Sequence, residues 1–370
     1  MRSAPTTKLC PLDEPPRPTH PAIDVHDFCF VHSADLHLGA KRWLRVSPSD
    51  AAVKLRIDQA DTLALRSLVD LCLTHQARFL LCAGDIIDGW CRDYMVALRF
   101  ADELLRLRGA GCQVLLLLGN HDVRSRMLKS LPLPGFVRIL GVRGPETRLF
   151  PELSVAVHGW SAPDVSPGTD TALLYPPPIA GYLNIGLLHT SADGRKGHVD
   201  YAPSSRLTLR RHGYDYWALG HVHQREVVAR APWIVFPGNL QARGARESGE
   251  KGATLVQVRG ARISTVKHVA VDAVRFDTLT VHTDSLGRFA QILAHVARAL
   301  REYRPEKLTI LRLEIRGQAS AACLLRIPAS QRAREMNGVI ATTRGPNVWV
   351  DEIRVNTGND LGSWPLVKAA

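Results

Sequence analysis

The 370-residue sequence lacks the features that mark membrane and secreted proteins. No run approaches the ~20 consecutive apolar residues that a membrane-spanning helix requires, and the first residues lack the apolar stretch of a secretory signal. We therefore expect a soluble, cytoplasmic protein without a membrane partner. Internal repeats are not evident.

Cysteine is scarce, with seven residues in the chain and no Cys-x-x-Cys pair. An odd and dispersed set of this kind does not predict a disulfide framework. We interpret the cysteines as reduced thiols. Cys29, Cys82 and Cys112 lie in or near apolar runs and are expected to be packed side chains.

Acidic residues are also in deficit, with 35 Asp and Glu against 47 Lys and Arg, which gives a formal net charge of +12. An excess of positive charge favours a polyanionic partner such as nucleic acid. Many soluble enzymes share this balance, so charge alone does not decide the partner.

The composition divides the chain into three predicted regions. Residues 1–26 carry six prolines and almost no apolar periodicity, which predicts a disordered, Pro-rich lead-in. Residues 27–275 alternate short apolar runs with helical patterns and contain the residues suited to chemistry. Residues 276–370 combine one amphipathic helix with alternating strands and predict a small α+β cap domain.

The apolar runs at residues 28–32, 79–83 and 114–118 predict buried strands, and the patterns at 49–76 and 93–107 predict helices. The resulting order of strand, helix, strand, helix, strand is expected for a parallel α/β sheet with right-handed crossovers. Such sheets place their active sites beyond the carboxyl ends of their strands.

Residues capable of binding a metal follow five separate apolar runs. In chain order they are Asp35 with His37, Asp85, Asn120, His189, and His221 with His223. Their order and local spacing resemble the calcineurin-like metallophosphoesterases, whose signature is Asp-x-His, Gly-Asp-x-x-Asp, Gly-Asn-His-Asp/Glu, a lone His and Gly-His-x-His. Each short motif is weak alone, but all five are present in order without substitution. The resemblance implies a four-layer α-β-β-α sandwich followed by the small cap.

The resemblance also implies two divalent metal ions that activate a hydroxide for attack on a phosphodiester. Asp85 would bridge them, because a carboxylate can join two cations and a neutral imidazole cannot. The first ion would take Asp35, His37 and His223, and the second Asn120, His189 and His221. Oxygen and nitrogen ligands without a thiolate favour Mn²⁺, Fe²⁺ or Zn²⁺, with Mg²⁺ as a further alternative. Mn²⁺ is expected on family grounds.

Three further residues are expected to take part in catalysis. By the resemblance, His121 protonates the leaving oxygen or steadies the phosphate, and Asp122 orients its imidazole. Asp88 is expected to hold a ligand in place. His158 lacks a matching motif and is expected to be structural, and neither His198 nor His212 is expected to bind a metal.

A narrower resemblance concerns residues 201–203, 213–225 and 236–252, which look like the bacterial DNA-repair exonuclease branch related to SbcD and YhaO. It implies a DNA exonuclease or endonuclease whose cap binds DNA. Basic residues follow several ligand motifs, and Arg124, Arg225 and Arg243 are the expected phosphate contacts, with a solvated basic surface as the alternative.

Two other functions stay open. The same metal centre can serve a small-molecule or cyclic-nucleotide phosphodiesterase or phosphatase, and a non-catalytic scaffold could keep the fold. DNA is the expected partner, and a homodimer is an open alternative.

Nucleases of this branch continue into helices that dock on an SbcC-type ATPase, whereas this chain stops at Ala370 soon after a strand. We therefore expect either no such ATPase or a different docking surface.

Overall fold

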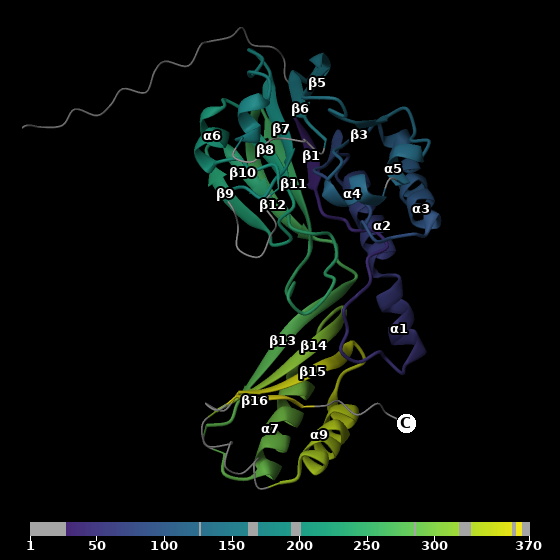
Figure 1. Cartoon of the computed structure of the whole chain (residues 1–370), viewed down its shortest axis with the longest axis vertical. Helices are drawn as coiled ribbons and strands as arrows, with labels where there is room; N and C mark the ends of the chain where they lie inside the picture. The colour runs from purple at the N-terminus through teal and green to yellow at the C-terminus, as the bar shows by residue number, and fades with distance from the viewer. Residues whose placement is uncertain are drawn as a thin grey trace, which may run out of the picture.

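The computed structural model describes residues 27–125, 127–161, 169–193, 201–284, 286–317, 327–356 and 360–364. The predicted Pro-rich segment 1–26, His198 and Ala370 lie outside these residues. Two six-stranded sheets form the larger unit, and a four-stranded sheet lies beyond them (Figure 1). Among the described residues, no helix is both long and apolar enough to cross a membrane.

The first large sheet has the strand order β12-β11-β1-β2-β3-β4. Its strands are β1 (Phe28–Ser33), β2 (Phe79–Cys82), β3 (Gln113–Leu116), β4 (Val137–Ile139), β11 (Gly252–Arg259) and β12 (Arg262–Ala270). Strands β1 to β4 are parallel, and β11 pairs antiparallel with β1. The predicted parallel arrangement is confirmed. The sequence did not indicate β12, because no residue of this edge strand is buried and it has no apolar run.

Helices α1 (Ala51–Asp58), α2 (Ala60–Thr74) and α3 (Tyr94–Leu105) connect the first strands. The single helix predicted for residues 49–76 is two helices, separated at Gln59. Packing explains the break. Val53 and Ile57 of α1 pack against the third sheet, whereas α2 covers the first. Asp50 caps α1 by accepting hydrogen bonds from two amides of its first turn.

The second large sheet has the strand order β5-β6-β7-β8-β10-β9. Its strands are β5 (Glu146–Phe150), β6 (Val155–Gly159), β7 (Leu183–His189), β8 (Tyr216–Gly220), β9 (Glu226–Arg230) and β10 (Trp233–Phe236). The short helix α6 (Arg206–Arg211) packs on its outer face through Leu209, beside Trp217 and Leu219. Strands β6, β7, β8 and β10 are parallel to one another, so their carboxyl ends share one edge.

The two large sheets bury a common core. Phe30 and Leu115 from the first sheet pack with Ile185 from the second. The alternate residues Val31 and Leu116 point the other way, into the cluster beneath α2 and α3. Helices, sheet, sheet and helix therefore form four layers, which confirms the predicted sandwich. Its hydrophobic core aligns the ends of the two sets of strands.

The third sheet contains β13 (Val274–His282), β14 (Leu308–Arg316), β15 (Val348–Asn356) and β16 (Asp360–Trp364). Strands β13 to β15 are parallel, and β16 joins them antiparallel. Helices α7 (Phe289–Glu302) and α9 (Ala329–Thr343) cover one face (Figure 1). Leu311 and Leu313 point toward these helices, whereas Arg312 lies on the other face, at the cleft described below.

The third sheet is joined to the larger unit by polar contacts as well as by α1. Gln241 accepts a hydrogen bond from the amide of Ala273 at 2.9 Å and donates to the carbonyl of Val274 at 2.5 Å. Asp351 of β15 accepts from the amide of Arg45 at 2.9 Å, and the Arg45 guanidinium lies 3.0 Å from Glu352. These contacts hold the open face of the third sheet beside the loops that follow β1 and β10.

Candidate metal centre

The residues predicted to bind metal lie at the carboxyl ends of strands from both large sheets. Asp35 and His37 follow β1, Asp85 follows β2, Asn120 opens the short helix α4 (Asn120–Ser125) after β3, His189 ends β7, and His221 and His223 follow β8. Because the sheets face each other, these ends converge on one point. A further short helix, α5 (Met127–Ser130), follows α4. The structure thus brings the predicted residues together.

The backbone is strained at this point. Asp35, His37, Asp85 and His221 have positive φ angles of 51°, 43°, 54° and 93°. Such conformations are uncommon for residues with a side chain and persist only where the surroundings enforce them. Here they turn polar side chains inward immediately after apolar strands.

Gly119 allows the ends of β2 and β3 to approach each other. A Cβ atom on Gly119 would lie 2.2 Å from Oδ1 of Asp85. This space is needed because the same Oδ1 accepts a hydrogen bond from the amide of His121 at 2.8 Å. The glycine before the Asn-His pair therefore fixes the carboxylate of Asp85 as well as turning the chain.

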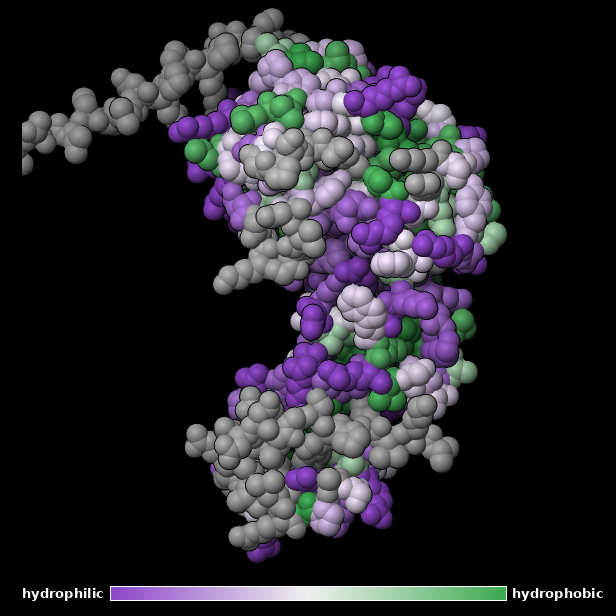
Figure 2. Space-filling model, viewed as in Figure 1, coloured by the Kyte–Doolittle hydropathy of each residue, from purple (hydrophilic) through white to green (hydrophobic). Residues whose placement is uncertain are grey.

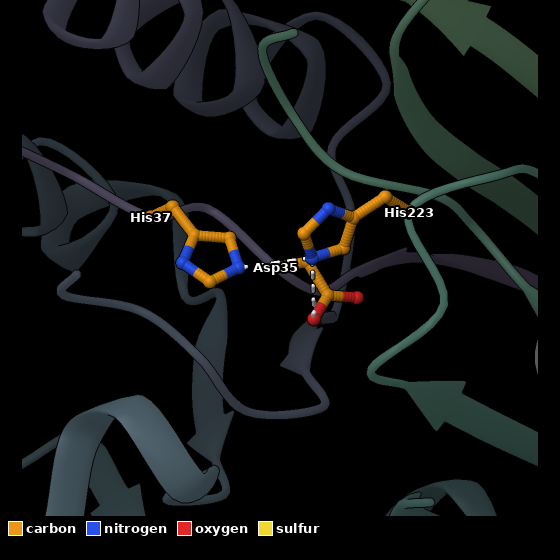
Figure 3. A group of neighbouring side chains, drawn as sticks. All are labelled: Asp35, His37 and His223. Atoms are coloured by element: carbon orange, nitrogen blue, oxygen red, sulfur yellow. Dashed lines mark hydrogen bonds and ion pairs between the residues drawn. The ribbon is translucent and has the colours of Figure 1, made fainter. Parts of the chain in front are cut away.

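Asp35, His37 and His223 form the first subsite (Figure 3). The Nε2 atoms of His37 and His223 lie 3.0 Å apart, and Nε2 of His223 lies 3.9 Å from Oδ1 of Asp35. Asp35 also accepts two hydrogen bonds from the amide of His221, at 3.0 and 2.9 Å. Two imidazole nitrogens directed at one point beside a buried carboxylate fit a cation there.

The second subsite contains Asp85, His189 and His221, with Asn120 beside them. Nε2 of His189 lies 3.4 Å from Oδ2 of Asp85 and 3.2 Å from Oδ1 of Asn120. The same Oδ2 of Asp85 lies 3.8 Å from Nε2 of His37 in the first subsite. Asp85 therefore stands between the two groups, in the place expected for a bridging carboxylate.

Neighbouring groups select the tautomers of two histidines. Nδ1 of His189 donates to the carbonyl of Ala83 at 2.7 Å, and Nδ1 of His223 donates to Oε1 of Glu247 at 2.8 Å. In each neutral ring the lone pair is then on Nε2, the atom directed at the cluster. Hydrogen bonds of this kind orient metal-binding histidines and increase their basicity. Glu247 was not predicted as a site residue, although it belongs to the segment that carries the narrower resemblance.

The electrostatics of the cluster favour bound positive charge. Burial raises the pKa of Asp35 to about 6, and the neighbouring Asp85 adds to the rise. For Asp85 burial opposes ionisation, but His189 and His37 outweigh it and lower the pKa. Burial likewise disfavours protonated His189, yet Asp85 raises its pKa to about 9. Carboxylates buried this close together are satisfied most simply by cations.

The neighbours of His121 differ from those predicted. Asp122 is buried, and its carboxylate accepts hydrogen bonds from the amides of Ile86, Ile87 and Gly119 at 2.9 to 3.1 Å. These contacts fix the loop after β2, and the orienting role predicted for Asp122 is not among them.

Asp88 is the acidic neighbour of His121. Oδ2 of Asp88 lies 3.5 Å from Nδ1 of His121 and 3.4 Å from Nδ1 of His37. The His121 Nδ1 atom also accepts a hydrogen bond from the amide of Gly89 at 3.0 Å, so the neutral ring carries its proton on Nε2. Burial opposes protonation of His121, but Asp88 and Asp85 raise its pKa. Asp88 thus contacts both a predicted ligand and the predicted acid.

The three predicted phosphate contacts have different environments. Arg243 lies 3.1 Å from Oε1 of Glu247 and 3.9 Å from Oδ2 of Asp88, so it borders the metal centre. Arg124 is exposed beside His121. Arg225 lies near Tyr216 and His268 and does not line the cleft described next.

A cleft of about 960 Å³ runs from His223 to the open face of the third sheet. Its charged lining consists of six basic residues, Arg45, Arg243, Arg246, Lys251, Arg312 and Arg354, and three acidic residues, Glu247, Asp351 and Glu352. Figure 2 shows hydrophilic side chains gathered where the molecule is hollowed between the larger unit and the third sheet. A polyanion in this cleft would pass directly beside the metal ligands.

His158 and His212, which were not expected to bind metal, lie away from the cluster. His158 is buried in β6, where Nδ1 lies 2.8 Å from Thr147 Oγ1 and Nε2 lies 3.1 Å from Asn184 Oδ1. Nε2 of His212 donates to the carbonyl of Pro176 at 2.9 Å. Neither belongs to the cluster, and the structural role predicted for His158 agrees with these contacts.

Comparison with known families places this fold and site in one class. A model for the calcineurin-like phosphoesterases matches residues 29–225, and a model for the middle domain of the metallophosphoesterase YhaO matches residues 276–358. The chain belongs to the calcineurin-like phosphoesterase family. Its fold and its cluster of residues that could hold metal ions are those of a metallophosphoesterase.

Particular relatives share part of their length with the chain. It is 32% identical over 242 residues to the uncharacterised metallophosphoesterase YhaO of Bacillus subtilis, covering 64% of this chain and 59% of that protein. It is 26% identical over 275 residues to the DNA double-strand break repair protein Mre11 of Sulfurisphaera tokodaii, covering 69% of this chain and 66% of that protein. The matches thus span less than two thirds of each relative. A dimetal phosphatase from Danio rerio aligns at a TM-score of 0.40 and 14% identity, over 62% of this chain and 92% of the phosphatase.

Proposed function

We propose that this metallophosphoesterase is a Mn²⁺-dependent DNA exonuclease or endonuclease that acts in DNA repair. The observation that carries the proposal is the cleft from His223 to Arg312 and Arg354 of the third sheet, in which six basic lining residues outnumber three acidic ones. Positive charges spread along a groove suit a chain of phosphates better than a single phosphate group. The similarity to a relative named as a DNA break repair protein supports the same substrate.

The residues of the centre divide the chemistry among them. Asp35, His37 and His223 would hold one divalent cation, and Asn120, His189 and His221 another, with Asp85 between them. Bound there, the cations supply Lewis-acid stabilisation of the phosphate and a nucleophile from water at neutral pH. The carboxylate of Asp85 is locked in place by the amide of His121.

His121 is the residue of this chain that supplies a proton. Its side chain is 20% exposed, whereas that of His37 is 1% exposed, so it can reach a bound substrate. Asp88 stabilises its protonated form, and the proton passes from the imidazole to the leaving oxygen. The third sheet and Arg243 would hold the sugar-phosphate backbone on the cleft side of this acid.

End-labelled single-stranded, blunt and overhanging DNA, each incubated with Mn²⁺, tests the proposal. We expect shortened products that disappear in EDTA and in the His121→Asn variant, which should still bind metal. Hydrolysis of a chromogenic phosphodiester or a cyclic nucleotide, with every DNA left intact, would favour a small-molecule phosphodiesterase. Metal binding without hydrolysis of any ester would instead indicate a scaffold.

A further inference from the structure

Two exposed tryptophans lie beside the metal centre. Trp43 and Trp90 expose 65% and 72% of their surface, although a tryptophan normally gains stability by burial. Each has an arginine over its ring, with Cζ of Arg243 5.4 Å from the centre of Trp43 and Cζ of Arg124 5.4 Å from that of Trp90. The proposed catalytic chemistry uses neither aromatic ring.

The backbone of Trp43 is held against the loop that carries Arg243. Its amide donates to the carbonyl of Arg243 at 2.7 Å, and it forms a parallel bridge with Gly244. The side chain of Arg243 is only 15% exposed, because it also pairs with Glu247. A rigid guanidinium therefore supports one face of the indole, which lines the cleft next to His223.

The backbone of Trp90 is held by the loop that follows β2. Its amide donates to Oδ1 of Asp88 at 3.0 Å. The preceding residue, Gly89, donates to His121 and lies so close to Arg124 that an added Cβ would meet the Cδ atom of that arginine at 3.1 Å. Trp90, Arg124 and the predicted proton donor are thus next to one another.

Asp88 connects the two tryptophan–arginine pairs. One of its oxygens accepts from the amide of Trp90, and the other lies 3.9 Å from the guanidinium of Arg243 beneath Trp43. Oδ2 also lies within 3.5 Å of Nδ1 of both His37 and His121. The Trp43 ring therefore lies in the cleft beside the metal ligand His223, and the Trp90 ring lies against Arg124, next to His121.

We infer that Trp43 and Trp90 stack on unpaired bases, so that the preferred substrate is a single strand or a single-stranded end of DNA. This inference rests on the nuclease function proposed above and narrows its substrate. Aromatic side chains bind bases of any sequence by stacking, and an arginine over the ring strengthens such contacts. In a duplex the base faces are already stacked, which leaves both rings without a partner.

Binding can be measured apart from cleavage. Fluorescence anisotropy with Ca²⁺ in place of Mn²⁺ would follow a labelled single-stranded oligonucleotide, the same strand with abasic positions, and a blunt duplex. We expect Trp43→Ala and Trp90→Ala to bind the intact single strand roughly 5- to 100-fold more weakly. Their affinity for the abasic strand and for the duplex should change far less, because the phosphates remain.

Two controls distinguish stacking from misfolding. Trp43→Phe and Trp90→Phe retain an aromatic face and should restore most of the lost affinity. Leu207→Ala removes another large side chain, 56% exposed on α6, and should bind all three probes like the wild type. Circular dichroism would confirm the fold of each variant.

The outcomes also distinguish this inference from the function on which it rests. Equal losses on the intact strand, the abasic strand and the duplex would overturn stacking. Unchanged affinity in both alanine variants, with DNA still cleaved in Mn²⁺, would overturn the inference and leave the nuclease intact. A wild-type protein that neither binds nor cleaves any DNA would overturn both.

Discussion

His121 and Asp88 form an imidazole–carboxylate pair beside the metal centre, with Nδ1 of the imidazole 3.5 Å from Oδ2 of the carboxylate. The same oxygen lies 3.4 Å from Nδ1 of His37. One side chain thereby influences both a predicted ligand and the predicted proton donor. Asp88, which was expected to hold a metal ligand in place, therefore also contacts His121, the residue that the resemblance had paired with Asp122.

Replacing Asp88 and replacing Asp122 should therefore give different results. We expect Asp88→Asn to lower kcat by roughly 10- to 100-fold while the protein stays folded, because His121 loses its stabilising charge. Asp122→Asn should chiefly reduce stability, because its carboxylate accepts hydrogen bonds from three buried amides. Steady-state kinetics and urea unfolding of both variants measure the difference. An Asp122 variant that keeps full stability and loses only kcat would contradict the assignment.

Convergence of the metal residues was predictable because each follows a short apolar strand with a turn signal. The contact of Asp88 with His121 was not, because it depends on how the loop after β2 folds around Asp85, whose φ is +54°. Sequence spacing likewise cannot show that Glu247 reaches Nδ1 of His223. The separation of α1 from α2 also escaped prediction, because a contact with the distant third sheet causes it.

Glu247 should control metal affinity without touching the metal. Its carboxylate accepts the Nδ1 proton of His223, so Glu247→Gln should weaken Mn²⁺ binding by roughly 10- to 100-fold. Isothermal titration with Mn²⁺ checks this. Glu250→Gln is a matched control, because Glu250 is exposed and pairs with Arg275 at 3.3 Å. Identical metal affinity in both variants would remove the role given to Glu247.

Gly119 should be intolerant of a single added methyl group. The Cβ of Gly119→Ala would meet the Asp85 carboxylate at 2.2 Å, so either the carboxylate or the turn must move. We expect at least a roughly 100-fold loss of phosphodiesterase activity, because catalytic groups misplaced by about 1 Å lose rate on this scale. Gly109→Ala provides the control, since a Cβ there meets no atom within 4 Å. Wild-type activity in Gly119→Ala would show that the close approach is not needed.

Salt dependence should show which arginines touch the phosphate backbone. Arg246 is exposed in the cleft, so Arg246→Gln should reduce the slope of log affinity against log salt by about 0.7 for a single strand. Arg148→Gln, on the exposed strand β5, should leave the slope unchanged. Binding titrations at several salt concentrations give these slopes. Equal slopes for Arg246→Gln and wild type would exclude that contact.

His158 should make stability depend on pH. Burial lowers its pKa to about 4, whereas an unfolded histidine titrates near 6.5. Between these values the unfolded chain binds a proton that the native protein does not. This residue therefore lowers the free energy of unfolding by up to roughly 1.4 kcal/mol per pH unit as the pH falls from 6.5 toward 4. Urea unfolding at several pH values should show a shallower decline for His158→Gln, and parallel declines would contradict the prediction.

The loop from Asn239 to Glu247 connects the centre with the third sheet. At one end Glu247 accepts a hydrogen bond from His223. Near the other end Gln241 is hydrogen-bonded to the backbone of Ala273 and Val274, where β13 begins. Only five residues lie between Gln241 and Glu247 in the sequence, so a tilt of the third sheet acts on a metal ligand almost directly. Occupancy of the cleft and occupancy of the metal centre should therefore be thermodynamically linked, with each ligand changing the affinity for the other by the same factor.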